Sequence, residues 1–325
     1  MVFRKFVMAL GAMAVSAAAA VAADYPERSI SFVVPYGPGG ASDVAARLIT
    51  QKMSEKLGQT IVVENKPGAG GMLGVGYVAR QKADGYTIGM LPTSSTALAP
   101  YMSPITFTLD DLALIGSVVG YQFGLAVNAG SPYQTIDDLI EAAKKESLFY
   151  GSTSVTFLLA GMRLGELTGG SYEIVNYKSG PEVITAVLSN DIQVASQHPS
   201  GITPYVRDGK LRFLVSIGET RWTDFPEIPT LKEMGLDVIA ASEIAFFAPA
   251  GTPEAILGQL QAAAFEATND PGVRKQLQDL GLQVTNKPAD QVRQWMIDYF
   301  NDSAAPLSSV NAEWVLKGCF VNCKK

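Results

Sequence analysis

The most constraining feature of the sequence is a strand, a glycine-rich loop and a helix that occur twice in succession. Hydrophobic patterning predicts a strand over residues 30–35, a loop over 36–43 and a helix over 44–57. A second strand at 60–63 and a loop at 64–71 precede another helix, and a third strand ends in a run of serine and threonine. Strands that alternate with helices pair in parallel through right-handed crossovers. We therefore expect the three loops at one sheet edge, where ligands bind in open α/β sheets.

The remainder of the chain repeats the alternation of strands and helices. At roughly 100–200 residues per domain, 325 residues predict two domains. Further strands are expected at 123–127, 148–150, 174–177, 192–195 and 212–217, and another apolar stretch at 238–247. Further helices are expected at 135–145, 157–167, 181–188, 253–268, 271–280 and 288–300. The sequence alone leaves open which domain the last helices join.

The first glycine loop, Gly37-Pro38-Gly39-Gly40, is typical of an anion site. A helix follows it, so unpaired backbone N–H groups and the positive end of the helix dipole face outward. No Gly-Lys-Ser/Thr follows, which excludes a Walker phosphate loop. Residues 74–79 match a loose dinucleotide pattern but lie inside a predicted helix, where glycine serves packing. Glycines that merely permit turns are the alternative, yet two such loops beside four hydroxyl residues favour a polar binding site.

The N-terminal segment predicts export. Two basic residues precede an 18-residue uncharged segment that ends in small residues, the pattern of a signal peptide over residues 1–23 cleaved near Ala22 or Ala23. A retained membrane anchor is the alternative, although alanine-rich segments insert poorly. Cleavage would put the mature chain in the periplasm and Cys319 and Cys323 in an oxidising space, where they could form a short terminal disulfide.

Composition excludes several classes of function. The chain has 25 Lys and Arg against 31 Asp and Glu and no basic run, so nucleic acid is not an expected partner. Its single histidine, His198, and the lack of a Cys or His cluster argue against a metal site, a cofactor or a catalytic triad. A serine-dependent hydrolase would need Ser94 or Ser95 with Lys178 as the base. A binding protein without catalysis is the expectation.

Three segments resemble the successive signatures of one family: Val34 to Asp43, Val63 to Gly71, and Ala83 to Thr87. They are similar to those of the Bug receptors, the periplasmic solute-binding proteins of tripartite tricarboxylate transporters. The resemblance extends over about residues 25–300, with further similar segments at 177–180, 209–212, 226–230 and 248–253.

The resemblance implies a type II periplasmic-binding-protein fold, in which two crossing strands join two lobes around a ligand cleft. The crossings would fall near residues 117–127 and 238–247. Lobe 1 would comprise residues 24–120 and 246–325, and lobe 2 residues 121–245. The implied function is capture of a small organic carboxylate by a monomer that closes around it and delivers it to the membrane subunits of a transporter. A ligand-sensing partner of a signalling system is the alternative.

The same resemblance assigns the ligand site by position. The carboxylate cradle would be Tyr36, Gly39, Gly40, Ser42 and Asp43, with Gly70, Gly71, Ser94, Ser95 and Thr96 beside it. Lobe 2 would add Ser154, Thr156, Tyr177, Lys178 and His198, and the second crossing would add Glu243. Asp43 has an alternative role as a first-turn residue that the helix dipole favours.

Two departures from the family pattern concern lobe 2 and its crossing. The family's histidine after a Gly/Ser-rich loop is missing from residues 152–158, and His198 is either a ligand contact or a structural residue. Glu243 lies where the family often has a tryptophan. An inward Glu243 would repel plain dicarboxylates and favour an amino or hydroxy acid, whereas a solvent-facing Glu243 would not affect specificity.

Overall fold

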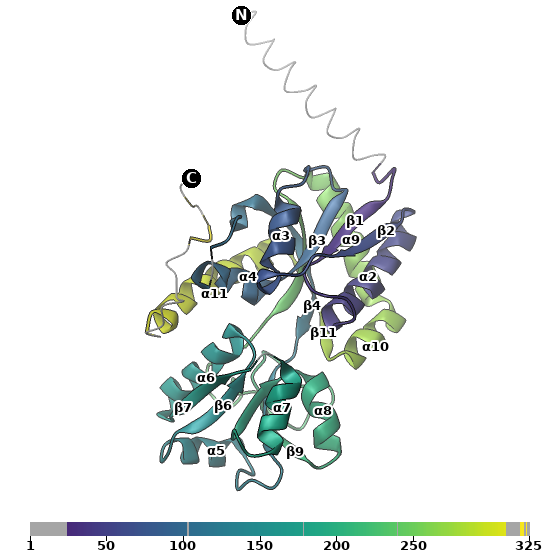
Figure 1. The fold of residues 1–325 in the computed structure, drawn as a ribbon. Coiled ribbons are helices and arrows are strands. Elements are labelled where there is room, and N and C mark those ends of the chain that lie inside the picture. Colours follow the sequence, from purple (N-terminus) through teal and green to yellow (C-terminus); the bar gives the residue numbers. More distant parts are fainter. Residues whose placement is uncertain are drawn as a thin grey trace, which may run out of the picture.

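The computed structural model describes residues 25–323 with gaps at 103, 178, 239, 310–318 and 322. Within these residues the strands form two sheets, each covered by helices, and the middle of the chain forms the separate lower body in Figure 1. This is the two-lobe α/β architecture expected from the sequence. The predicted signal peptide lies outside the described residues, and no helix in the described part is long and apolar enough to span a membrane.

Lobe 1 is built on a six-stranded sheet in the order β11-β4-β10-β3-β1-β2. Its strands are β1 (Ile30–Val34), β2 (Ile61–Asn65), β3 (Thr87–Pro92), β4 (Leu112–Tyr121), β10 (Glu243–Pro249) and β11 (Leu282–Pro288). β1 pairs in parallel with both β2 and β3, which confirms that the segments after these strands leave at one edge. β10 runs antiparallel to β3 and β4, and β11 runs antiparallel to β4.

Helices cover both faces of this sheet because successive strand residues point to opposite faces. Phe32 belongs to a buried core with residues of the helices on one face, and the next residue, Val33, belongs to a core on the other face. The first face carries α2 (Ala41–Leu57), α9 (Glu254–Asn269) and α10 (Pro271–Asp279). The second carries α3 (Met72–Ala79), α4 (Thr93–Met102) and α11 (Ala289–Ser309), with short 3₁₀ turns η1 (Ala69–Gly71) and η2 (Leu109–Asp111).

Lobe 2 is built on a five-stranded sheet in the order β7-β6-β8-β5-β9. Its strands are β5 (Gly124–Asn128), β6 (Leu148–Ser152), β7 (Tyr172–Asn176), β8 (Val194–Gln197) and β9 (Leu211–Ser216). Its helices are α5 (Ile136–Ala143), α6 (Val155–Thr168), α7 (Gly180–Leu188) and α8 (Pro199–Arg207). The capping box expected at the start of α5 is present, because the Thr135 side chain accepts from the amide of Asp138 and the carboxylate of Asp138 accepts from the amide of Thr135.

The chain passes between the sheets twice. Gln122 and Phe123 join β4 to β5, and residues 217–242 lead from β9 back to β10. Both passages fall within or beside the expected crossings at 117–127 and 238–247. The lobe boundaries at 120/121 and 245/246 stay predictions.

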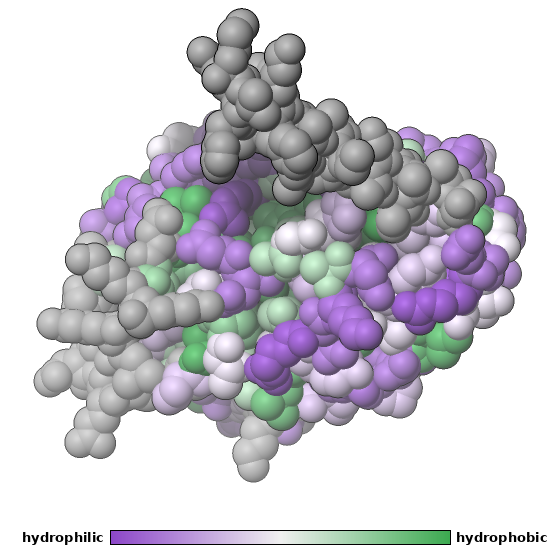
Figure 2. All heavy atoms as spheres, turned by 90° about the horizontal axis from the view of Figure 1, so that it is seen from above, coloured by the Kyte–Doolittle hydropathy of each residue, from purple (hydrophilic) through white to green (hydrophobic). Residues whose placement is uncertain are grey.

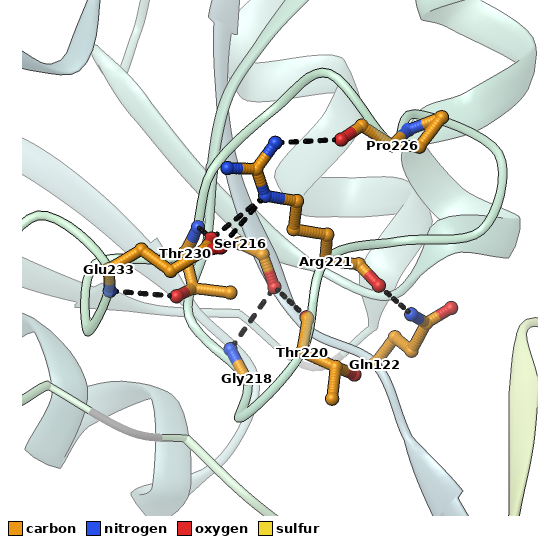
Figure 3. A network of polar contacts seen from close by, with 8 residues as sticks. All are labelled: Gln122, Ser216, Gly218, Thr220, Arg221, Pro226, Thr230 and Glu233. Carbon is orange, nitrogen blue, oxygen red and sulfur yellow. Dashed lines mark hydrogen bonds and ion pairs between the residues drawn. The ribbon is translucent and has the colours of Figure 1, made fainter.

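A polar network stiffens the second passage (Figure 3). The Arg221 guanidinium donates to both carboxylate oxygens of Glu233, at 3.0 and 2.9 Å, and to the carbonyl of Pro226. The Gln122 side-chain amide donates to the Arg221 carbonyl at 3.1 Å, which ties one crossing to the other. Because of the Arg221 hydrogen bond, the pKa of the Glu233 carboxyl lies below its usual value. The two connections are therefore linked to each other by side chains.

Several elements differ from the sequence expectation, and among them β4 and α8 were not expected at all. Residues 93–96, expected as a loop, form the first turn of α4, which is buried despite the serine and threonine run and contains Pro100. The strand β11 was not expected, because it is largely polar and its pairing with β4 is a tertiary contact. The disulfide between Cys319 and Cys323 is present, and Phe320 between them is buried in lobe 1.

Candidate functional site

A cleft of about 400 Å³ is lined by residues from both lobes. Lobe 1 contributes Tyr36, Gly40, Ala41, Ser42, Pro92, Ser94, Ser95, Leu280 and Gly281. Lobe 2 and the two crossings contribute Tyr121, Phe123, Thr153, Ser154, Thr156, Phe157, His198, Ser200 and Ser242. None of these described lining residues is Asp, Glu, Lys or Arg. Polarity in this cleft therefore comes from hydroxyl groups and from the backbone.

Four helices begin at the cleft, two from each lobe. Lining residues lie at the starts of α2 and α4 in lobe 1 and of α6 and α8 in lobe 2. The N-cap residues Gly40 and His198 place no side chain on the first amides of α2 and α8. Helix N-termini carry partial positive charge and unpaired N–H groups, so this arrangement suits a carboxylate without a cationic side chain.

Asp43 holds the first glycine loop in shape. Its carboxylate accepts hydrogen bonds from the Gly39 amide at 2.9 Å, the Asn65 side-chain amide at 2.8 Å and Arg47 Nε at 3.1 Å. The same Asn65 amide donates to the Tyr36 carbonyl at 2.9 Å. Although burial raises the pKa of Asp43, these donors outweigh it and hold the pKa below its usual value. The Asp43 side chain is 3% exposed and does not line the cleft, so it positions the loop.

The two adjacent glycines of this loop have different roles. Gly39 has φ +85°, a left-handed conformation that favours glycine, and its amide is taken by Asp43. Gly40 has φ −74° and lines the cleft, and a Cβ added there would have no heavy atom within 4 Å. A side chain at Gly40 would therefore extend into open space beside the cleft without straining the backbone.

Several predicted site residues lie away from the cleft lining. Gly70 and Gly71 form the η1 turn, and an added Cβ at Gly71 would lie 3.4 Å from Pro35, so the second loop packs against the first strand's end. Thr96 is fully buried on α4, and Tyr177 packs partly buried in lobe 2. Lys178 lies outside the described residues.

Two hydroxyl contacts join elements across the cleft. The Thr156 hydroxyl on α6 donates to Ser94 Oγ on α4 at 3.2 Å, which connects lobe 2 to lobe 1. Ser42 on α2 and Tyr121 at the end of β4 share a short hydrogen bond between their hydroxyl groups. Ser42, Ser94 and Thr156 all line the cleft, and their hydroxyls are already oriented by protein partners.

His198 lies in the cleft lining among aromatic rings. Burial lowers the pKa of its imidazole from 6.5 to about 4, although a hydrogen bond to the Gln122 backbone opposes this shift. The ring is therefore neutral at pH 7. It adds no positive charge to the cleft.

Glu243, for which the sequence left an inward and a solvent-facing orientation open, does not line this cleft. Glu243 lines a second cavity of about 180 Å³, and its carboxylate lies 2.5 Å from Lys287 Nζ on β11. Lys287 also lies 3.8 Å from Glu219 of the second passage. Burial lowers the pKa of Lys287, but the hydrogen bonds and negative charges of Glu243 and Glu219 together outweigh it and raise the pKa. The Glu243 side chain, 14% exposed, thus forms an ion pair at the crossing and is absent from the ligand cleft.

Comparison with known proteins decides the family. The family described as "Tripartite tricarboxylate transporter family receptor" matches residues 45–311 of the chain. The chain belongs to this family. The receptor is 34% identical over 293 residues to the "UPF0065 protein in gbd 5'region" of Cupriavidus necator, covering 86% of this chain and 89% of that protein. It is 32% identical over 295 residues to protein BugT of Bordetella pertussis, with the same two coverages.

Solved structures share the receptor's fold. A TctC solute-binding protein from Polaromonas superposes with a TM-score of 0.79 at 25% identity, covering 88% of the receptor and all of that chain. Two further structures at 24% identity share the fold. MatC from Rhodopseudomonas palustris, with bound malate, has a TM-score of 0.69 and covers 87% of the receptor and 100% of that chain. An R. palustris protein with adipate has a TM-score of 0.73, and the match covers 88% of the receptor and 98% of that chain.

The receptor's cleft also contains residues that sequence reasoning missed. Tyr121 and Phe123 lie at the first crossing, Phe157 on α6, and Leu280 and Gly281 just before β11. Apolar residues at these positions have the pattern of ordinary core residues. Only the expectation that a crossing borders the cleft could have pointed to Tyr121 and Phe123.

Proposed function

We propose that the receptor captures a small organic carboxylate in the interlobe cleft and delivers it to the membrane subunits of a tripartite tricarboxylate transporter. The observation that carries this proposal is the uncharged cleft at which four helix N-termini meet. The ligands of two proteins with the same fold, malate and adipate, are carboxylates and agree with it.

The cradle for the carboxylate would lie on lobe 1. Gly40, Ala41, Ser42, Ser94 and Ser95 line the cleft, and their backbone N–H groups and hydroxyls would bind the carboxylate. Because Asp43 already fixes the loop, little ordering cost would oppose binding. A ligand that also contacts α6 or α8 of lobe 2 would bind more tightly when the two lobes are closed around it. It would therefore shift the receptor toward the closed state.

Binding without catalysis is part of the proposal. Ser94 Oγ accepts from Thr156, and the histidine of the cleft has a pKa of about 4, too low for an efficient general base at pH 7. A hydrolase would need a base beside Ser94 or Ser95. Turnover of the bound compound by purified receptor would contradict the proposal.

We further propose that the mature receptor acts as a monomer in the periplasm after cleavage near Ala22 or Ala23. The Cys319–Cys323 disulfide fits an oxidising compartment. The mass of the exported protein would test the cleavage site, and its elution volume in size-exclusion chromatography would test the monomeric state.

The test of function is ligand release followed by titration. Mass spectrometry of compounds freed from purified receptor should reveal a carboxylate, and calorimetry should show that it rebinds. In Gly40→Val, rebinding should be lost, because the side chain enters the cleft while the backbone conformation is retained. Gly258→Val on exposed α9, where an added Cβ also meets no atom, is the matched control and should bind normally. Equal affinity in Gly40→Val and wild type would remove the loop from the site.

A further inference from the structure

Four rings form a continuous aromatic surface in the cleft, which we call the ring wall: Tyr121, Phe123, Phe157 and His198. The centroid of the His198 ring lies 5.4 Å from that of Tyr121, 4.8 Å from that of Phe123 and 5.8 Å from that of Phe157. Phe123 also packs edge-on against Phe157 at 4.9 Å and stacks on Tyr121 at 6.0 Å. The rings come from β4, the first crossing, α6 and the N-cap of α8, so both lobes meet at this surface.

The ring wall carries no positive charge that could pair with an anion. The imidazole of His198 is neutral at pH 7 because its pKa is about 4, and Tyr121 is the other titratable group of the wall. The described residues of the cleft lining include no charged side chain, and Leu280 of lobe 1 adds another apolar group. A carboxylate pressed against this surface would lose its hydration without gaining a counter-charge.

The cleft also offers hydrogen-bonding groups from both lobes. The Tyr121 hydroxyl of the ring wall shares a hydrogen bond with Ser42. The start of α2, with Gly40 and Ser42, and the start of α4, with Ser94 and Ser95, belong to lobe 1. The cleft therefore combines helix N-termini and hydroxyls suited to a carboxylate with an aromatic surface suited to an uncharged, planar body. Aromatic pairs contribute energy beyond the burial of their apolar area.

We propose that the ligand is an arylcarboxylate, whose carboxylate occupies the lobe 1 cradle and whose ring packs against the ring wall. This inference rests on the proposed function and narrows its ligand class from small organic carboxylates to those with an aromatic body. It replaces the expectation that Glu243 selects an amino or hydroxy acid.

Calorimetric titration of the mature receptor with matched probes tests the inference. The probes are benzoate and phenylacetate, cyclohexanecarboxylate as the non-planar control, and malate, adipate and glutamate as aliphatic carboxylates. The better of the two aryl probes should bind at least about tenfold more tightly than any aliphatic probe, since aromatic pairing contributes energy beyond the burial of apolar area. Cyclohexanecarboxylate should bind more weakly than benzoate.

Two variants connect this preference to the ring wall. Phe157→Leu should weaken the aryl probes roughly tenfold, whereas Phe149→Leu, an exposed ring on β6 outside the cleft, should leave them unchanged. His198→Arg adds a positive charge to the ring wall and should raise the affinity for adipate relative to benzoate. Because this variant is expected to gain binding, it tests the ring wall even if Phe157→Leu fails to fold.

The outcomes separate the inference from the function on which it rests. If malate, adipate or glutamate binds more tightly than the aryl probes and Gly40→Val abolishes that binding, the arylcarboxylate inference is overturned and the proposed function survives. If no carboxylate binds, both are overturned. An aryl preference that persists unchanged in Phe157→Leu and His198→Arg would also overturn the role of the ring wall.

Discussion

The two lobes bring different kinds of groups to the cleft. Lobe 1 presents backbone and hydroxyl groups at the starts of α2 and α4, and buried Asp43 fixes the loop geometry. Lobe 2 and the first crossing add hydroxyls at the starts of α6 and α8 and, in contrast to lobe 1, the rings of Phe157, His198, Tyr121 and Phe123. Backbone groups recognise a carboxylate whatever is attached to it, while side chains recognise the rest of the ligand. We therefore propose that lobe 1 binds the anion and that the ring wall selects the ligand.

Removal of the Asp43 carboxylate should have the largest effect. Asp43→Ala leaves the Gly39 amide and the Asn65 side-chain amide without their acceptor, which should cost about 2 kcal/mol or more of unfolding free energy. The disordered loop should weaken binding of every carboxylate, roughly 100-fold, because the cradle is no longer pre-organised. Urea denaturation and calorimetry measure the two effects. An Asp43→Ala receptor with normal affinity would contradict the role assigned to lobe 1.

The unfolding free energy should depend on pH through His198 of lobe 2, over a different pH interval from Asp43 of lobe 1. The pKa of His198 is about 4 in the folded chain and 6.5 in its ordinary state, so unfolded chains bind a proton first as the pH falls. His198 should therefore stabilise the fold above pH 6.5, and this contribution should be lost between pH 6.5 and 4, by roughly 3 kcal/mol in total. His198→Gln should flatten the unfolding free energy over that interval. A variant whose pH profile parallels the wild type would show that His198 does not titrate in this way.

Asp43 provides the internal contrast. Because its pKa lies below the usual value near 3.8, its stabilising contribution is present above that pH and is lost only as the pH falls further, through the folded pKa. Unfolding of the wild type and of Asp43→Ala should therefore converge in strongly acidic solution, outside the interval in which His198 acts.

The hydrogen bond between Ser42 and Tyr121 joins the lobe 1 cradle to the ring wall, and its removal tests whether the two act together. Tyr121→Phe keeps the ring but removes its hydroxyl bond to Ser42, so we expect a loss of about 1 kcal/mol of unfolding free energy. Affinity should fall only several-fold and equally for all carboxylates, since the Ser42 hydroxyl is left less well oriented. Calorimetry across the probe panel measures this. A change confined to aryl probes would mean that the Tyr121 hydroxyl itself selects the ligand.

Glu243→Gln should have the smallest effect. The variant breaks the pair with Lys287 at a partly exposed crossing, which should cost less than about 1 kcal/mol. Its ligand profile in a thermal-shift screen should match that of the wild type, because Glu243 does not line the cleft. Glu219→Gln, at the other partner of Lys287, is the matched control. Improved binding of plain dicarboxylates by Glu243→Gln alone would contradict this placement.

The sequence predicts the lobe 1 cradle better than the rest of the site for a physical reason. The glycine loop, its helix and the parallel pairing of β1 with β2 and β3 are determined by local patterns that lie close together in the chain. The ring wall is different, since Phe123, Phe157 and His198 meet only after the second lobe has folded. The hydrophobic pattern at each position is that of a core residue.

The orientation of Glu243 could not be predicted from the sequence. It depends on how β10 pairs with β4. The register of that pairing shifts between Ile244 and Ala245 and again between Phe246 and Phe247. Its partner Lys287 lies on β11, whose polar sequence predicts no strand. Neither the orientation nor the ion pair could be derived without the tertiary structure.

The central claim is that the cleft between the lobes holds a carboxylate against the start of α2. A crystal structure of the receptor with the carboxylate that it retains during purification would test this claim most directly. We expect the carboxylate oxygens within hydrogen-bond distance of the groups at Gly40 and Ser42, with the body of the ligand against the ring wall. A carboxylate bound instead beside Lys287 in the cavity of about 180 Å³ at the crossing would contradict the account.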